Sequence, residues 1–304
     1  MISGNVENKR VAIQGELGSN SDMAARLAAS EAGLAPVEIL ACTLSTEVLE
    51  ALVSGAAGWG VLPIENSLHG SVAEHYDLLL DNAVLITGET LLHIQHNLIA
   101  VPGVKLAEVR RVLSHPVALS QCRHWLRAHP EIEAVPFHDT AGGVRHVIEK
   151  GLKDTAAIAP LLAAQQYGGT VLAEAIEDHK ENYTRFFTLC PSAEKYEPAA
   201  NCVIDKLSVA FSLEHRPGTL VRALEALGLC GLDLTRIESR PVPGSPWEYI
   251  FFVDARFDDP TQADSAMASL EASCRMVKEL GRYRAARPLA AVLQTRNADK
   301  TNRR

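Results

Sequence analysis

Short apolar runs alternate with helix-forming stretches along residues 10–190, and this alternation constrains the fold more than any other feature of the chain. Repeated strand–helix units predict a mainly parallel sheet with helices on both faces. Ligands of such sheets bind at the carboxyl ends of the strands. Strands are expected at 11–13, 37–40, 59–64, 84–92, 94–101, 112–114, 134–137 and 156–159. Helices are expected at 22–32, 45–54, 116–128, 141–150 and 161–167, and a further element opens at 65–67 and runs through 72–80.

The pattern changes after residues 191–201, a polar stretch with two prolines that predicts a linker. Strands follow at 207–213, 234–241, 249–257 and 276–280, with helices at 217–229 and 264–274. This βαββαβ order predicts a ferredoxin-like domain. Residues 287–304 are polar and basic without periodicity, so we expect a disordered tail. The length of 304 residues suits two domains.

The composition is that of an ordinary globular protein, with 47% hydrophobic and 22% charged residues. A formal net charge of −8 argues against nucleic acid or an anionic membrane as partner, but it permits a small anionic substrate. Met1–Arg10 contains no apolar core of a signal peptide, and no run approaches the ~18–20 residues of a membrane helix. A cytoplasmic protein is the resulting expectation. The six cysteines form no CxxC pair, so we expect reduced thiols and no metal site.

Residues 182–187 place a hydroxyl, Thr184, beside a guanidinium, Arg185, directly before an apolar strand. Such a pair can hold an oxyanion and a leaving hydroxyl together. By itself it is also compatible with a solvated strand end. Four other segments place polar side chains at the ends of expected strands or the starts of expected helices. They are Gly18–Ser21, Pro63–Ser67, Ser114–Pro116 with Gln121, and Asp139–Gly142.

These segments, in this order, closely resemble the prephenate dehydratase family over residues ~10–190. The resemblance rests on Pro63-Ile64-Glu65-Asn66-Ser67, Ser114-His115-Pro116 with Gln121-Cys122, and Asn182-Tyr183-Thr184-Arg185-Phe186. Residues 206–285 resemble an ACT regulatory domain, through His215–Leu220 and Glu238–Pro241.

The resemblance implies a two-lobed α/β catalytic domain, similar to type 2 periplasmic binding proteins, followed by the ferredoxin-like ACT domain. The catalytic domain would span 8–191, with lobe 1 at about 10–88 and 170–190 and lobe 2 at about 89–169. Residues 192–205 would form the linker, 206–286 the ACT domain and 287–304 the tail.

The implied reaction converts prephenate to phenylpyruvate with loss of carbon dioxide and the ring hydroxyl. It needs a hydrogen-bond donor to the departing hydroxyl, and the resemblance assigns this role to Thr184. Glu65 is a candidate acid if burial raises its pKa, or else a carboxylate that stabilises a helix start. His115 is a titratable candidate, or else a cap of the following helix. The sequence does not decide which of the two assists Thr184.

The implied substrate-binding residues are Asn66, Ser67, Ser114, Gln121, Thr140, Arg185, Ser19 and Ser21. Arg185 would contact a substrate carboxylate or form a structural salt bridge. The implied effector is L-phenylalanine, and its site would comprise Pro217, Gly218, Thr219, Leu220, Glu238, Ser239, Arg240 and Pro241. Close packing is the alternative role for Gly218. Pairing of ACT sheets implies a homodimer or homotetramer, and the resemblance implies neither a cofactor nor a metal.

Three positions depart from the family's usual pattern. Asp233 stands where asparagine is common, His69 where an acidic residue is common, and Val117 where glutamine is common. Two alternatives to prephenate dehydration stay open. One is dehydration of arogenate, whose side chain carries an amine. The other is a solute-binding or amino-acid-sensing protein without catalysis, because such proteins share the fold. The strength and sign of regulation by phenylalanine also stay open.

Overall fold

The structure of the protein is a computed structural model that describes residues 9–191, 203–242, 244–245 and 247–286. These residues group into two compact units. The N-terminal unit comprises the described part of Glu7–Ser71 and Leu92–Phe186. The C-terminal unit comprises Val72–Leu91 and the described residues from Phe187 onward. The predicted tail at 287–304 and residues 192–202 of the predicted linker lie outside the described residues, and the predicted domain boundaries stay a prediction.

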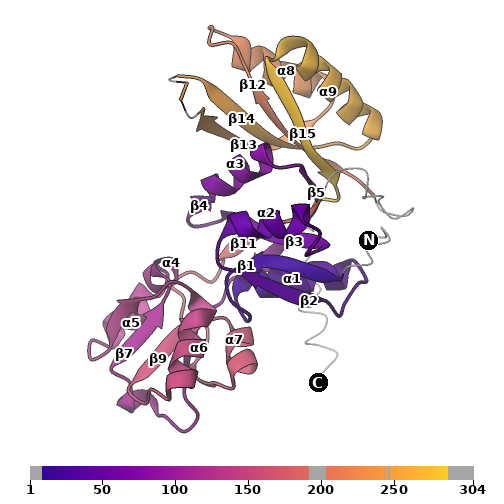
Figure 1. The fold of residues 1–304 in the computed structure, drawn as a ribbon. Helices are drawn as coiled ribbons and strands as arrows, with labels where there is room; N and C mark the ends of the chain where they lie inside the picture. Colours follow the sequence, from indigo (N-terminus) through magenta and orange to yellow (C-terminus); the bar gives the residue numbers. More distant parts are fainter. Residues whose placement is uncertain (1–8, 192–202, 243, 246, 287–304) are drawn as a thin grey trace, which may run out of the picture. The chain divides into compact units, whose positions relative to one another are not determined.

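The first sheet has the strand order β2-β1-β3-β11-β5, with the short β4 paired to β3 (Figure 1). Its strands are β1 (Arg10–Gln14), β2 (Glu38–Cys42), β3 (Trp59–Asn66), β4 (Gly70–Ser71), β5 (Val84–His93) and β11 (Tyr183–Pro191). β1 is parallel to β2 and β3, and the helices α1 (Asn20–Glu31) and α2 (Ser45–Val53) pack on β1 and β3. The expected α/β fold is confirmed here, and β11 is the strand with which the chain returns to this sheet.

The second sheet has the order β10-β6-β9-β7-β8. Its strands are β6 (Asn97–Ala100), β7 (Arg111–Ser114), β8 (Glu133–Pro136), β9 (Thr155–Ala159) and β10 (Thr170–Ala173), and the 3-10 helix η1 (Leu106–Glu108) precedes β7. Neighbouring side chains enter opposite cores: Val112 packs with Leu119 and Cys122, whereas Leu113 packs with residues of α6 (Thr140–Lys150) and α7 (Leu161–Tyr167). The sheet is therefore buried on both faces, as expected for its parallel part.

Three expectations for local structure need correction. The sequence predicts one helix over 116–128, but two are present, α4 (Pro116–Ser120) and α5 (Arg123–Ala128). Asp178 accepts hydrogen bonds from the backbone N–H groups of Arg123 and His124, so a distant carboxylate starts the second helix. Glu65 and Asn66 end β3 instead of opening a helix. β10 was not expected, because its four residues show no alternation, and it pairs in the second sheet although 170–190 was assigned to lobe 1.

The C-terminal sheet has the order β13-β14-β12-β15, with all pairs antiparallel. It consists of β12 (Lys206–Ser212), β13 (Asp233–Pro241), β14 (Tyr249–Arg256) and β15 (Met276–Tyr283), with α8 (Thr219–Leu229) and α9 (Pro260–Ser273) packed on one face (Figure 1). The expected βαββαβ order is confirmed. α3 (Ala73–Asp81) contacts the other face, where the Tyr76 ring lies 5.1 Å from that of Phe252.

Candidate active site

Thr184, at the start of β11, shares a hydrogen bond with Asn66 at the end of β3. Asn66 Nδ2 donates to Thr184 Oγ1 at 2.9 Å, and also to Asn182 Oδ1 at 2.8 Å and the Tyr183 carbonyl at 3.2 Å. Because the Thr184 oxygen accepts from Asn66, its own hydrogen is left to point elsewhere. Thr184 is half-buried at this point, so its hydroxyl can donate to a molecule bound beside it.

The sequence predicts Asn66 and Ser67 to bind substrate. In the structure they connect the end of β3 and the loop after it to the start of β11. Asn66 Oδ1 accepts the backbone N–H groups of Leu68 and His69, at 3.0 and 3.1 Å. Ser67 N donates to the Tyr183 carbonyl, and Tyr183 N donates to Ser67 Oγ at 3.0 Å. These bonds fix the backbone of Tyr183, directly before Thr184. Asn66 and Ser67 thus hold the start of β11 from the end of β3 and the loop that follows it.

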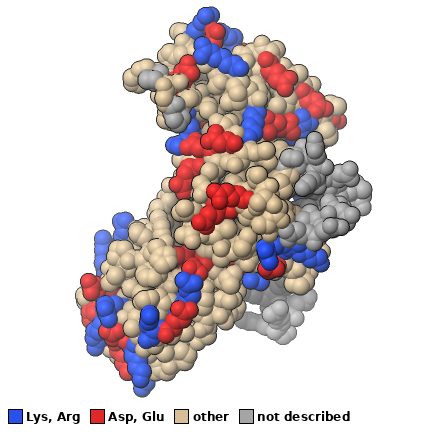
Figure 2. Space-filling view, in the orientation of Figure 1, with Lys and Arg blue, Asp and Glu red and all other residues tan. Residues whose placement is uncertain are grey.

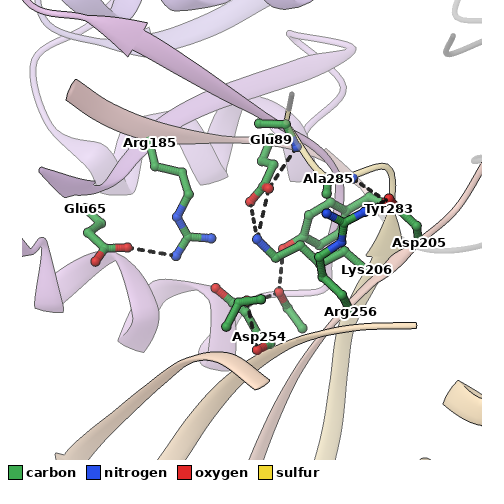
Figure 3. A network of polar contacts seen from close by, with 12 residues as sticks. Glu65, Glu89, Arg185, Asp205, Lys206, Asp254, Arg256, Tyr283 and Ala285 are labelled. Atoms are coloured by element: carbon green, nitrogen blue, oxygen red, sulfur yellow. Dashed lines mark hydrogen bonds and ion pairs between the residues drawn. The ribbon is translucent and has the colours of Figure 1, made fainter. Parts of the chain in front are cut away.

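Arg185 points toward Glu65, and their side chains form an ion pair at 3.2 Å (Figure 3). The Arg185 side chain is 10% exposed, whereas that of Glu65 is 40% exposed. The salt bridge considered as the alternative role of Arg185 is therefore present. Glu65 is the more accessible partner, so it does not meet the condition of burial under which we expect it to act as an acid.

A cavity of about 590 Å³ brings together four of the predicted substrate-binding or catalytic residues, Ser19, Ser21, His115 and Thr140. Ser19 is the N-cap of α1, where its hydroxyl accepts the backbone N–H of Asp22. Asp139, directly before Thr140, is the N-cap of α6 and accepts the backbone N–H of Gly142 at 2.6 Å. The N-cap expected at Asp139 is confirmed. Two helix N-termini thus border one cavity, an arrangement that favours a bound anion.

Other charged and titratable groups also border the cavity. Glu16 lines the cavity and is paired with Arg145 through two contacts of 2.9 Å, so the charge of its carboxylate is balanced by the guanidinium. His115 is the N-cap of α4, with Nδ1 accepting the backbone N–H of Val117 at 3.3 Å, so its alternative role as a cap is present. Burial raises the pKa of the Cys42 thiol, helped by the nearby Glu47 and Glu50 carboxylates, and keeps it protonated at the cavity wall.

Two predicted substrate-binding residues make internal hydrogen bonds instead. Ser114 is fully buried, and its hydroxyl donates to the Ile158 carbonyl at 2.6 Å. Gln121 is buried between two histidines, with Nε2 at 3.0 Å from His69 Nδ1 and Oε1 at 2.7 Å from His96 Nε2. Both side chains connect segments of the N-terminal unit, and they are absent from the cavity lining described above.

Sequence reasoning missed three residues around these groups. Asn182 is fully buried against Asn66, and its position directly before the Thr184 strand was the available signal. His138 lines the cavity beside Asp139, but one histidine before a helix cap carries no distinctive pattern. His96 contacts Gln121 from a buried position, and no local pattern in the sequence indicates this pairing. Within the described ranges, no cluster of three or more His, Cys, Asp or Glu side chains is arranged to hold a metal ion.

The predicted effector residues lie in the C-terminal unit. Gly218 is the N-cap of α8 with φ +82°, a left-handed conformation that favours glycine and accounts for it better than close packing does. The helix begins at Thr219, two residues later than expected, and Thr219 Oγ1 donates to the carbonyls of Glu214 and Arg216. Leu220 packs against the domain core, and Pro217 precedes the cap.

The second predicted effector segment lies on β13, at one edge of the sheet. Arg240 is ion-paired with Asp77 of α3, with its Nη2 at 2.7 Å from Asp77 Oδ2. Glu238 accepts from Arg236, whereas Ser239 and Pro241 are exposed. The segment therefore contacts α3 on one side of the sheet and exposes alternate residues on the other.

On the face drawn in Figure 2, Lys and Arg side chains are intermixed with Asp and Glu over the second sheet and its helices. Among the helices that the structure describes, none has the length and apolar character needed to cross a membrane.

Comparisons with known proteins agree with one another. The family model for prephenate dehydratase matches residues 11–194. A chloroplastic arogenate dehydratase/prephenate dehydratase 2 of Arabidopsis thaliana is 38% identical over 286 residues, covering 90% of this chain and 72% of the relative. The structure of a prephenate dehydratase from Arthrobacter aurescens in complex with L-Phe has a TM-score of 0.79 at 32% identity, covering 91% and 90% of the two chains. GqqA, described as a novel type of quorum-quenching acylase, also has a TM-score of 0.79, at 31% identity and with 91% and 98% covered.

Proposed function

Because the chain belongs to the prephenate dehydratase family, we propose that it converts prephenate to phenylpyruvate, carbon dioxide and water, with Thr184 as donor to the leaving hydroxyl. The hydrogen bond from Asn66 Nδ2 to Thr184 Oγ1 carries this proposal. Because Thr184 Oγ1 accepts from Asn66, its own hydrogen points away from Asn66 and is available to the leaving oxygen.

In the proposed reaction, the bond between the ring and its carboxylate breaks and releases carbon dioxide. The electron pair enters the ring, which becomes aromatic as the ring carbon–oxygen bond breaks. The departing hydroxide takes up a proton and leaves as water. Thr184 stabilises the negative charge that develops on this oxygen, because a donor aimed at developing charge lowers the barrier. Arg185 is ion-paired with Glu65, so it stabilises its strand and does not bind the carboxylate that must leave.

The cavity bordered by α1 and α6 suits the anionic groups of such a substrate. The backbone N–H groups at two helix starts, with the hydroxyls of Ser19, Ser21 and Thr140, supply donors without a fixed cation. Donors of this kind hold a carboxylate and do not oppose its loss as strongly as an arginine would. We assign these residues to substrate positioning.

We further propose that the C-terminal domain is an ACT domain through which L-phenylalanine inhibits the enzyme. The βαββαβ order, the Gly218 turn and the likeness to a dehydratase in complex with L-Phe support this. Among the described residues, β13 forms hydrogen bonds in the sheet only with β14, so its outer edge is open to a second copy of the chain. We therefore propose a homodimer or homotetramer. The cytoplasmic location stays a prediction that cell fractionation would test.

Arogenate is the second candidate substrate, because the Arabidopsis relative is named for both activities. The decisive assay supplies the purified full chain with prephenate or arogenate and measures phenylpyruvate and phenylalanine. We expect phenylpyruvate from prephenate with the higher kcat/KM, and a lower rate when phenylalanine is added. No product from either substrate would refute the dehydratase function. A higher kcat/KM with arogenate would make arogenate the preferred substrate in place of prephenate. Sedimentation with and without phenylalanine tests the oligomer.

A further inference from the structure

The loop between β3 and β4 contains a histidine, His69, that the proposed chemistry does not use. The loop, Ser67–His69, follows Asn66 directly, and its N–H groups at Leu68 and His69 donate to Asn66 Oδ1. The Asn66 amide is therefore engaged at both ends, by the loop at Oδ1 and by Thr184 at Nδ2. Whatever fixes this loop also fixes the hydrogen-bond partner of Thr184.

The His69 side chain extends from the first sheet to α4, which packs in the core of the second sheet. His69 Nδ1 lies 3.0 Å from Gln121 Nε2, and His69 Nε2 lies 3.4 Å from Ser120 Oγ. α4 begins at the N-cap His115, which lines the cavity, and ends at Ser120. One short helix thus contacts the cavity at its start and the Asn66 loop at its end.

The contacts are satisfied by one arrangement of protons. Ser120 Oγ donates to the Val117 carbonyl at 2.7 Å, so toward His69 it can only accept. His69 Nε2 must then carry the hydrogen, which leaves Nδ1 as the acceptor for the Gln121 amide. Gln121 Oε1 consequently faces His96 Nε2. Of the two ring nitrogens of His96, Nε2 must therefore carry the hydrogen, which it donates across 2.7 Å.

His96 holds the Gln121 amide in this orientation from behind. It is 2% exposed, its backbone N–H donates to Glu177 Oε2, and burial lowers the pKa of its ring. Within the described part of the chain its Nδ1 has no hydrogen-bond partner. Reversing the Gln121 amide would move the His96 hydrogen to this buried, unpaired nitrogen, which is unfavourable.

We propose that His69 is a positioning residue: by accepting a hydrogen bond from Gln121, it anchors the Ser67–His69 loop to α4 and keeps Asn66 oriented toward Thr184. The inference rests on the proposed dehydratase function. An exposed loop histidine with incidental contacts is the alternative, and it predicts no effect on turnover.

Two variants of similar size distinguish a positioning role of His69 from incidental contacts of an exposed loop histidine. In His69→Asn the side-chain oxygen takes the place of Nδ1 and can still accept from Gln121, whereas His69→Leu removes both contacts. We expect His69→Leu to lower kcat by about 10-fold to 100-fold, because small misplacements of a reacting group have effects of this size. KM should stay within about threefold, because the lost interaction acts in the transition state. The Tm should shift by less than about 2 °C, because residue 69 is exposed.

The His69→Asn variant should keep kcat within about threefold of the wild-type value. Wild-type turnover in His69→Leu would overturn the proposal. Equal loss in both variants would also overturn it, since the imidazole itself would then be required for proton transfer. A fall in Tm that accounts for the lost activity would assign His69 a merely structural role.

A spectroscopic measurement tests the same hydrogen bonds without any substrate. Long-range ¹H–¹⁵N correlation spectra of ¹⁵N-histidine-labelled protein should show the His69 hydrogen on Nε2 and none on Nδ1, and His69→Leu identifies its signals. A ring with hydrogen on Nδ1 would contradict the assigned arrangement. If the wild-type chain made no product but showed this tautomer, the dehydratase function would fail, and with it the catalytic role of the anchored loop, although the anchor itself would stand.

Discussion

At the scale of single residues, Asn66 decides how Thr184 can act. A threonine hydroxyl is a weak acid, and its value to catalysis depends on where its hydrogen points. Here the oxygen accepts from Asn66, 118 positions away in the sequence, so its hydrogen is free to point toward a leaving group. Thr184 itself could be selected from the sequence, because the family resemblance assigns it. The hydrogen bond from Asn66 to Thr184 could not be predicted from the sequence.

We expect Thr184→Val to lower kcat by about 10²-fold to 10⁴-fold, because valine has the same shape but cannot donate to the leaving oxygen. Thr184→Ser is the matched control, since it keeps the hydroxyl, and it should retain most of the activity. Steady-state kinetics with prephenate, and circular dichroism to verify folding, check both. A valine variant with near-normal turnover would remove Thr184 from the chemistry.

His96 should make stability depend on pH. Burial lowers its pKa from the ordinary 6.5, so below that pH the unfolded chain takes up a proton that the folded chain does not. The folded state therefore loses stability progressively as the pH falls below about 6.5, until the pH reaches the lowered pKa of the folded state. We expect the Tm to fall less between about pH 7.5 and 5.5 in His96→Gln, which keeps a donor toward Gln121, than in the wild type. Identical pH profiles would contradict the neutral, buried ring.

At the scale of elements, packing between segments explains where local patterns misled. The helix predicted over 116–128 breaks at Gln121–Cys122, because Asp178 caps the second half and its own N–H donates to the Gln121 carbonyl. A capping carboxylate more than 50 residues away leaves no mark on the local sequence. By contrast, Asp139 caps the helix that immediately follows it, and this local signal was sufficient to predict the start of α6.

Gly281 in β15 lies where its strand meets β5 within the C-terminal unit. A Cβ at this position would clash with the backbone carbonyl of Ile86. A backbone atom cannot rotate aside as a side chain can, so the strand itself would have to shift. We expect Gly281→Ala to reduce the free energy of unfolding by about 1–3 kcal/mol. Gly228→Ala in α8 is the control: nothing lies near its added methyl, and the helix should gain up to about 1 kcal/mol. Chemical denaturation measures both, and equal effects would refute the close approach of β15 and β5.

At the scale of the whole molecule, the central strand β12 of the C-terminal sheet is buried on both faces. The β12 sequence alternates Leu207 and Val209 with Lys206 and Ser208, a pattern that predicts one buried and one solvated face. The structure buries the polar face too. Lys206 Nζ binds both oxygens of Glu89 on β5 at 2.9 Å (Figure 3). Ser208 Oγ donates to Asp254 at 2.6 Å. α3 and β5, which precede the second sheet in the sequence, thus complete the core of the C-terminal unit.

Removing one partner of the Lys206–Glu89 pair should destabilise the protein strongly. Both side chains are more than 90% buried, so Glu89→Gln leaves an uncompensated buried ammonium and should cost about 3–5 kcal/mol. The double variant Glu89→Leu with Lys206→Met removes both charges and should recover most of that loss, although the Ala286 N–H loses its acceptor at Glu89. Thermal and denaturant unfolding measure the cycle. Additive losses would show that the pair is not coupled.

The sequence by itself determined most of the order of strands and helices, the change from an α/β domain to a βαββαβ domain, and the polar segments that mark the family. These features depend on periodicity and on residues a few positions apart, so they can be recognised before folding. Tertiary structure alone decided that Ser114 and Gln121 bond internally, that Arg185 pairs with Glu65, and that Lys206 is buried against Glu89. Hydrogen bonds and ion pairs are made by groups that folding brings within about 3 Å. Glu65 and Arg185 are 120 positions apart in the sequence, and Glu89 and Lys206 are 117 apart, so the partners were set only when the sheets assembled.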